Sequence, residues 1–199
     1  ILWDKCFSEE DIRFVVLYFE NRYTDQYNVF IEKDGKVVSA LQLISYPFSY
    51  YGKTIGCAYL SGCCTDSEYR SQGLMNDVII KSLNQAKNNG ACFAALIPAS
   101  ESLFNYYEGT NFIPTFDYSK IKINKSQQST DNGQQFVSGC QILSHRVTES
   151  LSHQDDGELD FYQVYEYFNT KMRSRNCCVQ HDEYDFGVIL KDLELFDNH

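Results

Sequence analysis

Hydrophobic and polar positions alternate in two neighbouring stretches near the beginning of the chain. Residues 27–33 and 36–44 are rich in β-branched and aromatic side chains and flank Asp34-Gly35. A type I′ turn needs positive φ at its two central residues, and both Asp and Gly tolerate it, so this pattern predicts a β-hairpin. The long run of small and apolar residues over 55–65 then indicates a central strand that is buried on both faces.

Apolar residues that recur every three to four positions predict the helices. An amphipathic helix is expected over residues 9–22, with Ser8 as its N-cap. The strongest signal lies over residues 73–88, which carry one apolar stripe and end in Asn88-Asn89-Gly90. That ending suits the left-handed residue that often closes a helix.

After that helix, strands and helices alternate to the end of the first domain. We expect a buried strand over residues 91–97, a short helix over 100–107 and a last strand over 112–123. The order is therefore βαβαβ at the end of a β-meander. The polar tract over 124–135 lacks apolar periodicity and is expected to be an exposed loop or linker.

This tract divides the chain into two parts. We expect a first domain over residues 1–123 and a C-terminal segment over 136–199, in which aromatic and aliphatic residues predict helices near 161–168 and 186–193. The chain begins with Ile1 rather than Met and ends directly after a helical pattern, which is consistent with a piece of a longer protein.

The composition is that of a folded, globular protein. Of the 199 residues, 43% are hydrophobic and 15% aromatic, which supplies enough apolar surface to offset the entropy of ordering the chain. The formal net charge of -10 argues against binding of nucleic acid or anionic membranes, because both need clustered Lys and Arg. The acidity either favours a cationic substrate or serves only solubility.

The eight cysteines favour a reduced, cytoplasmic protein rather than a disulfide framework. No C-x-x-C pair occurs, and no apolar run reaches the roughly 20 residues of a membrane span. Cys177, Cys178 and His181 lie close together in the sequence, but tetrahedral zinc normally takes a fourth ligand and a wider spacing. We therefore expect neither a metal site nor a membrane segment.

The segment from Arg70 to Met75, between the central strand and the strongest helix, has the character of an anion-binding turn. The first N–H groups of a helix lack intrahelical partners, and the helix dipole adds about half a positive charge there. Gly73 would let a phosphate approach without a Cβ in the way, and Arg70 would add a cationic donor. An ordinary strand-to-helix turn has the same features, so these residues alone leave both interpretations open.

This segment resembles the acyl-CoA signature of the GNAT N-acyltransferases, Q/R-x-x-G-x-G/A at the start of a helix. Arg70, Gly73 and Met75 stand at the three marked positions, and Met75 replaces the usual small residue. A second stretch, from Tyr106 to Phe112, resembles the family's F-Y-x-x-x-G-F with Asn where Gly is usual. The resemblance covers about residues 5–123 and implies a GNAT fold, α/β (α+β), whose mixed and mostly antiparallel sheet is flanked by helices.

The resemblance implies acetyl-CoA as co-substrate and direct transfer of its acetyl group to a primary amine. Tyr107 would protonate the departing thiolate, with Tyr106 in reserve, although packing alone would also explain either ring. Cys63, Cys64 and Thr65 would offer main-chain groups to the pantetheine amides, while the two sulfurs stay inert. The pyrophosphate contacts would come from Arg70, Ser71, Gln72, Gly73, Leu74, Met75 and Asn76.

The acceptor and the general base are less evident from the sequence. The acceptor is expected to be a cationic small molecule or a protein lysine, and carboxylates are available at Glu20, Glu32, Glu68, Glu101 and Glu108. The arrangement most resembles bacterial tandem GNAT proteins of the enhanced-intracellular-survival type, in which a second GNAT-like domain follows the first. The alternatives are a catalytically silent acyl-CoA-binding module and an interaction subunit, such as a homo-oligomer, that docks through its aromatic segment 161–168.

Overall fold

A computed structural model describes residues 2–116 and 160–197. One mixed sheet forms its centre, with the strand order β1-β2-β3-β4 and a short β5 that pairs with β2. The β3–β4 pairing is parallel, whereas the β1–β2, β2–β3 and β2–β5 pairings are antiparallel. The strands are β1 (Asn28–Lys33), β2 (Lys36–Tyr50), β3 (Lys53–Thr65), β4 (Phe93–Ala95) and β5 (Cys178–Val179). The predicted α/β (α+β) fold with a mixed, mostly antiparallel sheet is confirmed.

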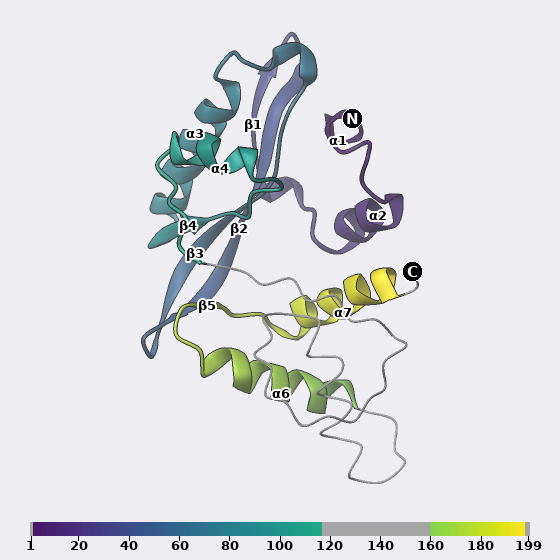
Figure 1. Cartoon of the computed structure of the whole chain (residues 1–199), viewed down its shortest axis with the longest axis vertical. Helices are drawn as coiled ribbons and strands as arrows, with labels where there is room; N and C mark the ends of the chain where they lie inside the picture. Colours follow the sequence, from purple (N-terminus) through teal and green to yellow (C-terminus); the bar gives the residue numbers. More distant parts are fainter. Residues whose placement is uncertain (1, 117–159, 198–199) are drawn as a thin grey trace.

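Helices cover both faces of this sheet (Figure 1). α3 (Leu74–Asn88) and α4 (Ser102–Glu108) lie on one side, and α1 (Leu2–Cys6) and α2 (Ile12–Asn21) lie on the other. The core on the α3 side consists of buried residues from β1, β2, β3, α3 and α4, among them Val29, Leu41, Leu43, Ala58, Leu60, Val78, Ile79, Ala86 and Tyr107. Burial of these apolar side chains is the main stabilising contribution to this layer.

The two hairpin turns follow the expected chemistry. Asp34 and Gly35 have φ of 52° and 73°, the two positive values that a type I′ turn requires. Tyr51 and Gly52 repeat the arrangement between β2 and β3, with φ of 44° and 77°. β2 is longer than predicted, because it continues past Ile44 to this second turn.

The helix predicted over residues 9–22 begins later in the structure, as α2 (Ile12–Asn21). Asp11, and not Ser8, caps α2, and its carboxylate accepts from the Arg13 N–H at 2.9 Å. Residues 8–10 instead connect α2 to α1, where Glu10 N donates to Phe7 O at 3.1 Å. With only five residues, α1 is too short to show helical periodicity, so the sequence did not reveal it.

Further along, the regular elements are shorter than predicted. The strand expected over 91–97 is limited to the three residues of β4. Residues 112–116 form no strand, and the remainder of the strand expected to 123 lies outside the described residues, as does the linker expected over 124–135.

The C-terminal segment contains α6 (Phe161–Arg173) and α7 (Glu183–Asp197), which confirms the helices expected near 161–168 and 186–193. Phe186 of α7 packs against Phe168 of α6, with ring centroids 4.7 Å apart. This segment also contacts the first part of the chain. β5 extends the sheet at β2, α7 packs against α2, and the Tyr184 hydroxyl donates to Asn21 O at 2.8 Å.

Candidate functional site

β3 contains a β-bulge near its carboxyl end. Its register with β2 slips between Ala40 and Gln42, so that Gly62 and Cys63 of β3 together face one residue of β2. Gly62 has a φ of 60°, and a Cβ at this position would lie 2.4 Å from the Trp3 ring. Only glycine therefore fits this position without displacing its neighbours.

β3 and β4 separate just before this bulge. Their parallel pairing ends at Tyr59 and Ala95, whereas β3 continues to Thr65. In the described part of the chain, the last six residues of β3 have no strand partner on that side. Main-chain N–H and C=O groups along such an opening can pair with a ligand that carries amides.

The bulge also decides which main-chain groups face this opening. Before it, Gly56 O accepts from Cys92 N at 2.9 Å, so the even-numbered residues of β3 face β4. After it, Asp66 N donates to a β2 carbonyl oxygen at 2.9 Å. By alternation, Cys63 and Thr65 face the opening, while the main chain of the residue between them faces β2.

The turn after β3 leads into α3, whose N-cap is Gly73 with a φ of 77°. Among the described residues, no neighbouring atom lies within 4 Å of the place where its Cβ would stand, so they leave the surface over the first turn open. The first intrahelical bond runs from Asp77 N to Gly73 O at 3.1 Å. The N–H groups of Leu74, Met75 and Asn76 precede it and are available to an anion.

Three residues shape the turn itself. Arg70 Nε donates to Thr65 O at 3.2 Å, so the guanidinium folds back over the end of β3. Ser71 adopts a positive φ of 60°. Gln72 Oε1 accepts from Lys33 Nζ at 3.1 Å, which brings a second cation to the turn. No local sequence pattern indicates Lys33, because its place on β1 gives no sign of this contact.

Leu74 and Met75 also contribute to packing. Leu74 is buried, and Met75 packs against the core between α3 and the sheet. Met75 is larger than the residue usual at this position of the motif, and the core accommodates part of its side chain.

Tyr107 reaches the bulge from α4. Its ring belongs to the apolar core with 9% exposure, and its hydroxyl lies close enough to the Cys63 thiol for the two groups to shift each other's pKa. Burial, and then the neighbouring Cys63, raises the pKa of Tyr107 above its ordinary value. The phenol thus keeps its proton at neutral pH. Tyr106 is more exposed, at 40%.

The two cysteines of the bulge remain thiols. Burial raises the pKa of Cys63 to about 11, although the nearby Tyr107 hydroxyl opposes this rise. Burial also raises the pKa of Cys64, and the adjacent Cys6 adds to the effect. A nucleophilic cysteine needs its thiolate at working pH, so this environment argues against a nucleophilic role for either sulfur.

The first part of the chain, which contains this candidate site, matches a known protein family. Residues 1–113, more than half of the chain, match the family described as acetyltransferase (GNAT) domain. The chain belongs to the GNAT family. As a GNAT protein it is an acyltransferase, and acetyl-CoA is the co-substrate that acetyltransferases of this family use.

Several solved structures are similar to this GNAT chain. A transcriptional regulator from Bacillus halodurans C-125 is 20% identical, with 58% of this chain and 79% of that chain covered and a TM-score of 0.46. Glucosamine-6-phosphate N-acetyltransferase from Arabidopsis thaliana is 17% identical, with 58% and 80% covered and a TM-score of 0.44. An acetyltransferase from Trypanosoma brucei is 16% identical, with 56% and 77% covered and a TM-score of 0.42. No curated protein matches the sequence.

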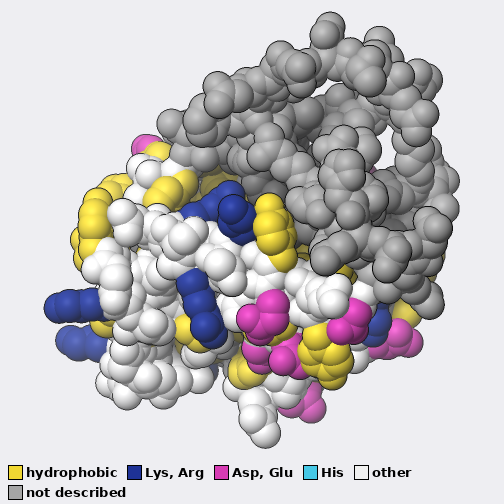
Figure 2. All heavy atoms as spheres, turned by 90° about the horizontal axis from the view of Figure 1, so that it is seen from below, with side chains coloured by type: hydrophobic (Ala, Val, Ile, Leu, Met, Phe, Trp, Pro, Cys, Tyr) yellow, Lys and Arg dark blue, Asp and Glu magenta, His cyan; other side chains and the backbone are white. Residues whose placement is uncertain are grey.

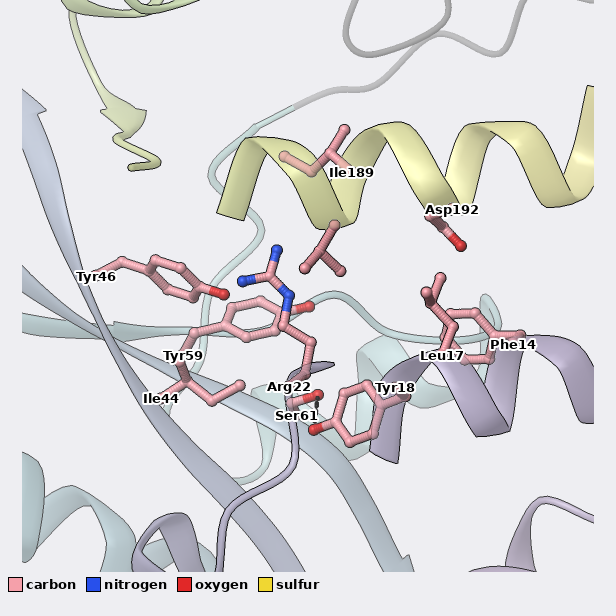
Figure 3. Close-up of a pocket in the computed structure, with 11 residues that line it drawn as sticks. Phe14, Leu17, Tyr18, Arg22, Ile44, Tyr46, Tyr59, Ser61, Ile189 and Asp192 are labelled. Carbon is pink, nitrogen blue, oxygen red and sulfur yellow. Dashed lines mark hydrogen bonds between the residues drawn. The ribbon is translucent and has the colours of Figure 1, made fainter. Parts of the chain in front are cut away.

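A pocket of about 160 Å³ lies on the other face of the GNAT sheet, between α2, α7 and the β2–β3 hairpin (Figure 3). Tyr59 and Ser61 of β3 line it, and so does Asp192 of α7. The Tyr18 hydroxyl donates to Ser61 Oγ at 3.2 Å across its floor. The sequence analysis did not find this pocket, because residues far apart in the chain form it.

Two further findings concern the described residues. No helix among them is long and apolar enough to cross a membrane. No group of three or more His, Cys, Asp or Glu side chains is placed to hold a metal ion within residues 2–116 and 160–197. Around the cysteine pair that was weighed for zinc, the Cys178 thiol lies 3.6 Å from Met172 Sδ, and His181 Nδ1 lies 3.3 Å from an Asp185 oxygen.

Proposed function

We propose that this GNAT protein is an N-acetyltransferase that transfers the acetyl group of acetyl-CoA directly to a primary amine. One observation carries the proposal. The opening between β3 and β4, the bulge at Cys63 and the hydroxyl of Tyr107 lie together in one place. Such an arrangement offers a thioester a hydrogen-bond donor for its carbonyl and a proton donor for its leaving group.

The cofactor would lie along the free edge of β3 and end at the turn into α3. Its pyrophosphate would accept hydrogen bonds from the first turn of α3, residues 74–76, with Arg70, Ser71 and Gln72 around it. Gly73 leaves the space that this approach needs. The pantetheine amides would pair with the main chain of Cys63 and Thr65, as an added strand does. Cys64, whose main chain faces β2, would support the bulge from within.

The chemical step then follows from these positions. The amine attacks the thioester carbon, while the Cys63 N–H stabilises the developing oxyanion. As the C–S bond breaks, the Tyr107 hydroxyl donates its proton to the departing thiolate. The nitrogen loses one proton as the amide forms, and this proton passes to water, which reprotonates the Tyr107 phenolate. Because both substrates are held together, no acyl-enzyme is needed, in agreement with the protonated state of the bulge thiols.

The domain division and the finer family relationship are part of the same proposal. Residues 1–123 would form the GNAT domain, 124–135 a linker, and 136–199 the beginning of a second GNAT-like domain, as in tandem proteins of the enhanced-intracellular-survival type. The order of the elements supports this, since a two-helix segment follows the first domain. The contacts of β5 and α7 with the first domain would then belong to the junction between the two.

Binding of the cofactor can be tested by the thermal midpoint of unfolding with and without acetyl-CoA. A ligand at 100 times its dissociation constant adds about 2.7 kcal/mol to stability. For a chain of this length we expect a rise of roughly 5–10 °C. A folded protein whose midpoint does not respond to millimolar acetyl-CoA would contradict the proposed site and favour a protein-interaction role instead.

A further inference from the structure

Asp192 of α7 has a carboxylate oxygen that the fold leaves unsatisfied. Its Oδ1 is enclosed, yet it accepts no hydrogen bond within the described part of the chain. The side chain projects from α7 into the pocket between α7, α2 and the sheet (Figure 3). An enclosed carboxylate without a donor lowers stability, so packing alone does not account for it. A ligand that brings a donor would satisfy it.

The charges around the pocket do not balance. Arg22 lines the pocket, but its guanidinium pairs with the Asp185 carboxylate and also donates to Asp185 O at 3.2 Å. Burial and Arg22 together lower the pKa of His181 to about 4, so His181 is neutral at pH 7. Lys191 Nζ is exposed and donates to Asn21 Oδ1 at 3.0 Å. Arg22 also acts on Asp192, whose pKa burial raises and the nearby Arg22 lowers. The hydrogen bonds of Arg22 nevertheless go to Asp185, so Asp192 Oδ1 has no direct donor among the described residues and can take a cation of its own.

The pocket also lies beside the place where acetyl transfer is proposed. Tyr59, which lines it, is the last residue of β3 that pairs with β4. Ser61, which also lines it, directly precedes the bulge at Gly62. Leu60 between them faces the core that contains Tyr107. A ligand in the pocket would therefore approach the opening from the face opposite α4.

The remaining walls determine what kind of molecule fits. Aliphatic and aromatic side chains make up much of the lining, and they come from Phe14, Leu17, Tyr18, Ile44, Tyr46, Tyr59, Val188 and Ile189. The volume of about 160 Å³ suits a molecule of a few carbons or one ring. An apolar wall with one unpaired carboxylate selects an ammonium group on a short apolar body.

We propose that this pocket is the acceptor site and that α7 completes it, with Asp192 binding the ammonium group of a small, largely apolar primary amine. The assignment of this pocket as the acceptor site rests on the proposed acetyl transfer. Its selectivity for amines does not. α7 lies beyond residues 1–113, which match the family, so the C-terminal segment would supply the specificity of this chain.

Calorimetric titration tests this without turnover, with propylamine, hexylamine and phenethylamine as probes and phenethyl alcohol as the uncharged control. We expect the wild-type chain to bind at least one amine and not the alcohol. Asp192→Asn should weaken amine binding at least 10-fold, because the paired charge is lost. Glu183→Gln removes a charge from an exposed position on the same helix and should leave binding unchanged.

Two further measurements separate a binding role from a structural one. Asp192→Asn should unfold at the same temperature as the wild type or higher, because it removes an enclosed charge. Ile189→Phe should also weaken amine binding, since it fills the pocket without a change of charge. A wild-type chain that binds none of the three amines, or equal affinity in the wild type and in Asp192→Asn, would overturn the proposal.

The same variants distinguish this proposal from the proposed function. Asp192→Asn and Ile189→Phe should keep the rise in thermal midpoint with acetyl-CoA, because neither residue lies near the turn into α3. Amine binding without any response to acetyl-CoA would refute the acetyl transfer and leave the amine site standing. A normal response to acetyl-CoA without amine binding would refute the amine site and leave the proposed acetyl transfer standing.

Discussion

Gly62 holds the bulge in its present shape, because its left-handed backbone and the Trp3 ring leave no space for a side chain. Gly62→Ala should therefore destabilise the protein by more than backbone strain alone. Gly35→Ala is the matched control, since Gly35 has a φ of 73° and no atom within 4 Å of its missing Cβ. The control should cost about 1–2 kcal/mol, and Gly62→Ala at least about 2 kcal/mol more.

Denaturant unfolding of the two glycine variants measures this difference. Equal losses would mean that the Trp3 ring moves aside without cost, and that it does not fix the bulge.

Tyr107 is the residue on which the proposed chemistry depends most. Tyr107→Phe removes one hydroxyl and keeps the packing of the ring against its neighbours. We expect kcat to fall by about 100-fold or more, since a general acid contributes at least that much. Affinity for acetyl-CoA should change little, and Tyr106→Phe should retain most activity. An unaltered kcat in Tyr107→Phe would assign the proton to another donor.

At the scale of elements, the two ends of α3 provide a matched pair. Gly73 and Gly90 both have positive φ, at 77° and 83°, and in the described part of the chain neither has a neighbouring atom within 4 Å of its missing Cβ. Only Gly73 lies at the end where the pyrophosphate is proposed. Gly73→Phe should weaken acetyl-CoA binding at least 10-fold, whereas Gly90→Phe should bear a similar backbone strain without this loss. Calorimetric titration of both variants gives the comparison, and equal weakening would place the pyrophosphate elsewhere.

The elements that the sequence predicted well are those with strong local signals. The β1–β2 hairpin follows from the turn chemistry at residues 34 and 35, and α3 follows from one apolar stripe with a left-handed stop. α1 is too short for such a signal. β4 is shortened because β3 separates from it after Tyr59, a consequence of tertiary structure.

The residues of the candidate site likewise fall into those that a local sequence pattern indicates and those that it does not. The turn over residues 70–75 could be predicted because one continuous segment carries its motif. Lys33 and Asp192 could not, because they meet the site only after β1 and α7 have packed. The proximity of Tyr107 to Cys63 likewise joins two elements that no local pattern relates.

For the molecule as a whole, the contact between the C-terminal segment and the first part of the chain should depend on pH. His181 is half-buried beside Tyr46 and Phe168, and its pKa is lowered to about 4 from 6.5. Between these two values the unfolded chain binds more protons than the folded one, so stability should decrease as the pH falls. The contribution is roughly 3 kcal/mol by pH 4.

His181→Phe should flatten this pH dependence, because Phe keeps the ring contacts and cannot be protonated. Thermal unfolding from pH 7 to pH 4 provides the measurement. An equally steep decline in the wild type and in the variant would show that other groups cause it.

The surface of the molecule is mixed in charge. On the face shown in Figure 2, Asp and Glu side chains gather on one side, whereas Lys and Arg side chains are scattered. The described part of that face has no continuous basic area of the kind that binding to nucleic acid requires. The formal net charge of -10 attracts cations over distances of about 10 Å, in keeping with an amine as the acceptor.

The central claim is acetyl transfer, and release of free coenzyme A thiol tests it most directly. The wild-type chain, acetyl-CoA and a panel of small primary amines would be mixed, and the new thiol measured against a reaction without amine. The account predicts thiol release that depends on the amine and falls at least 100-fold in Tyr107→Phe. Saturable binding of acetyl-CoA without release for any amine would contradict it, and would identify the chain as a silent acyl-CoA-binding module.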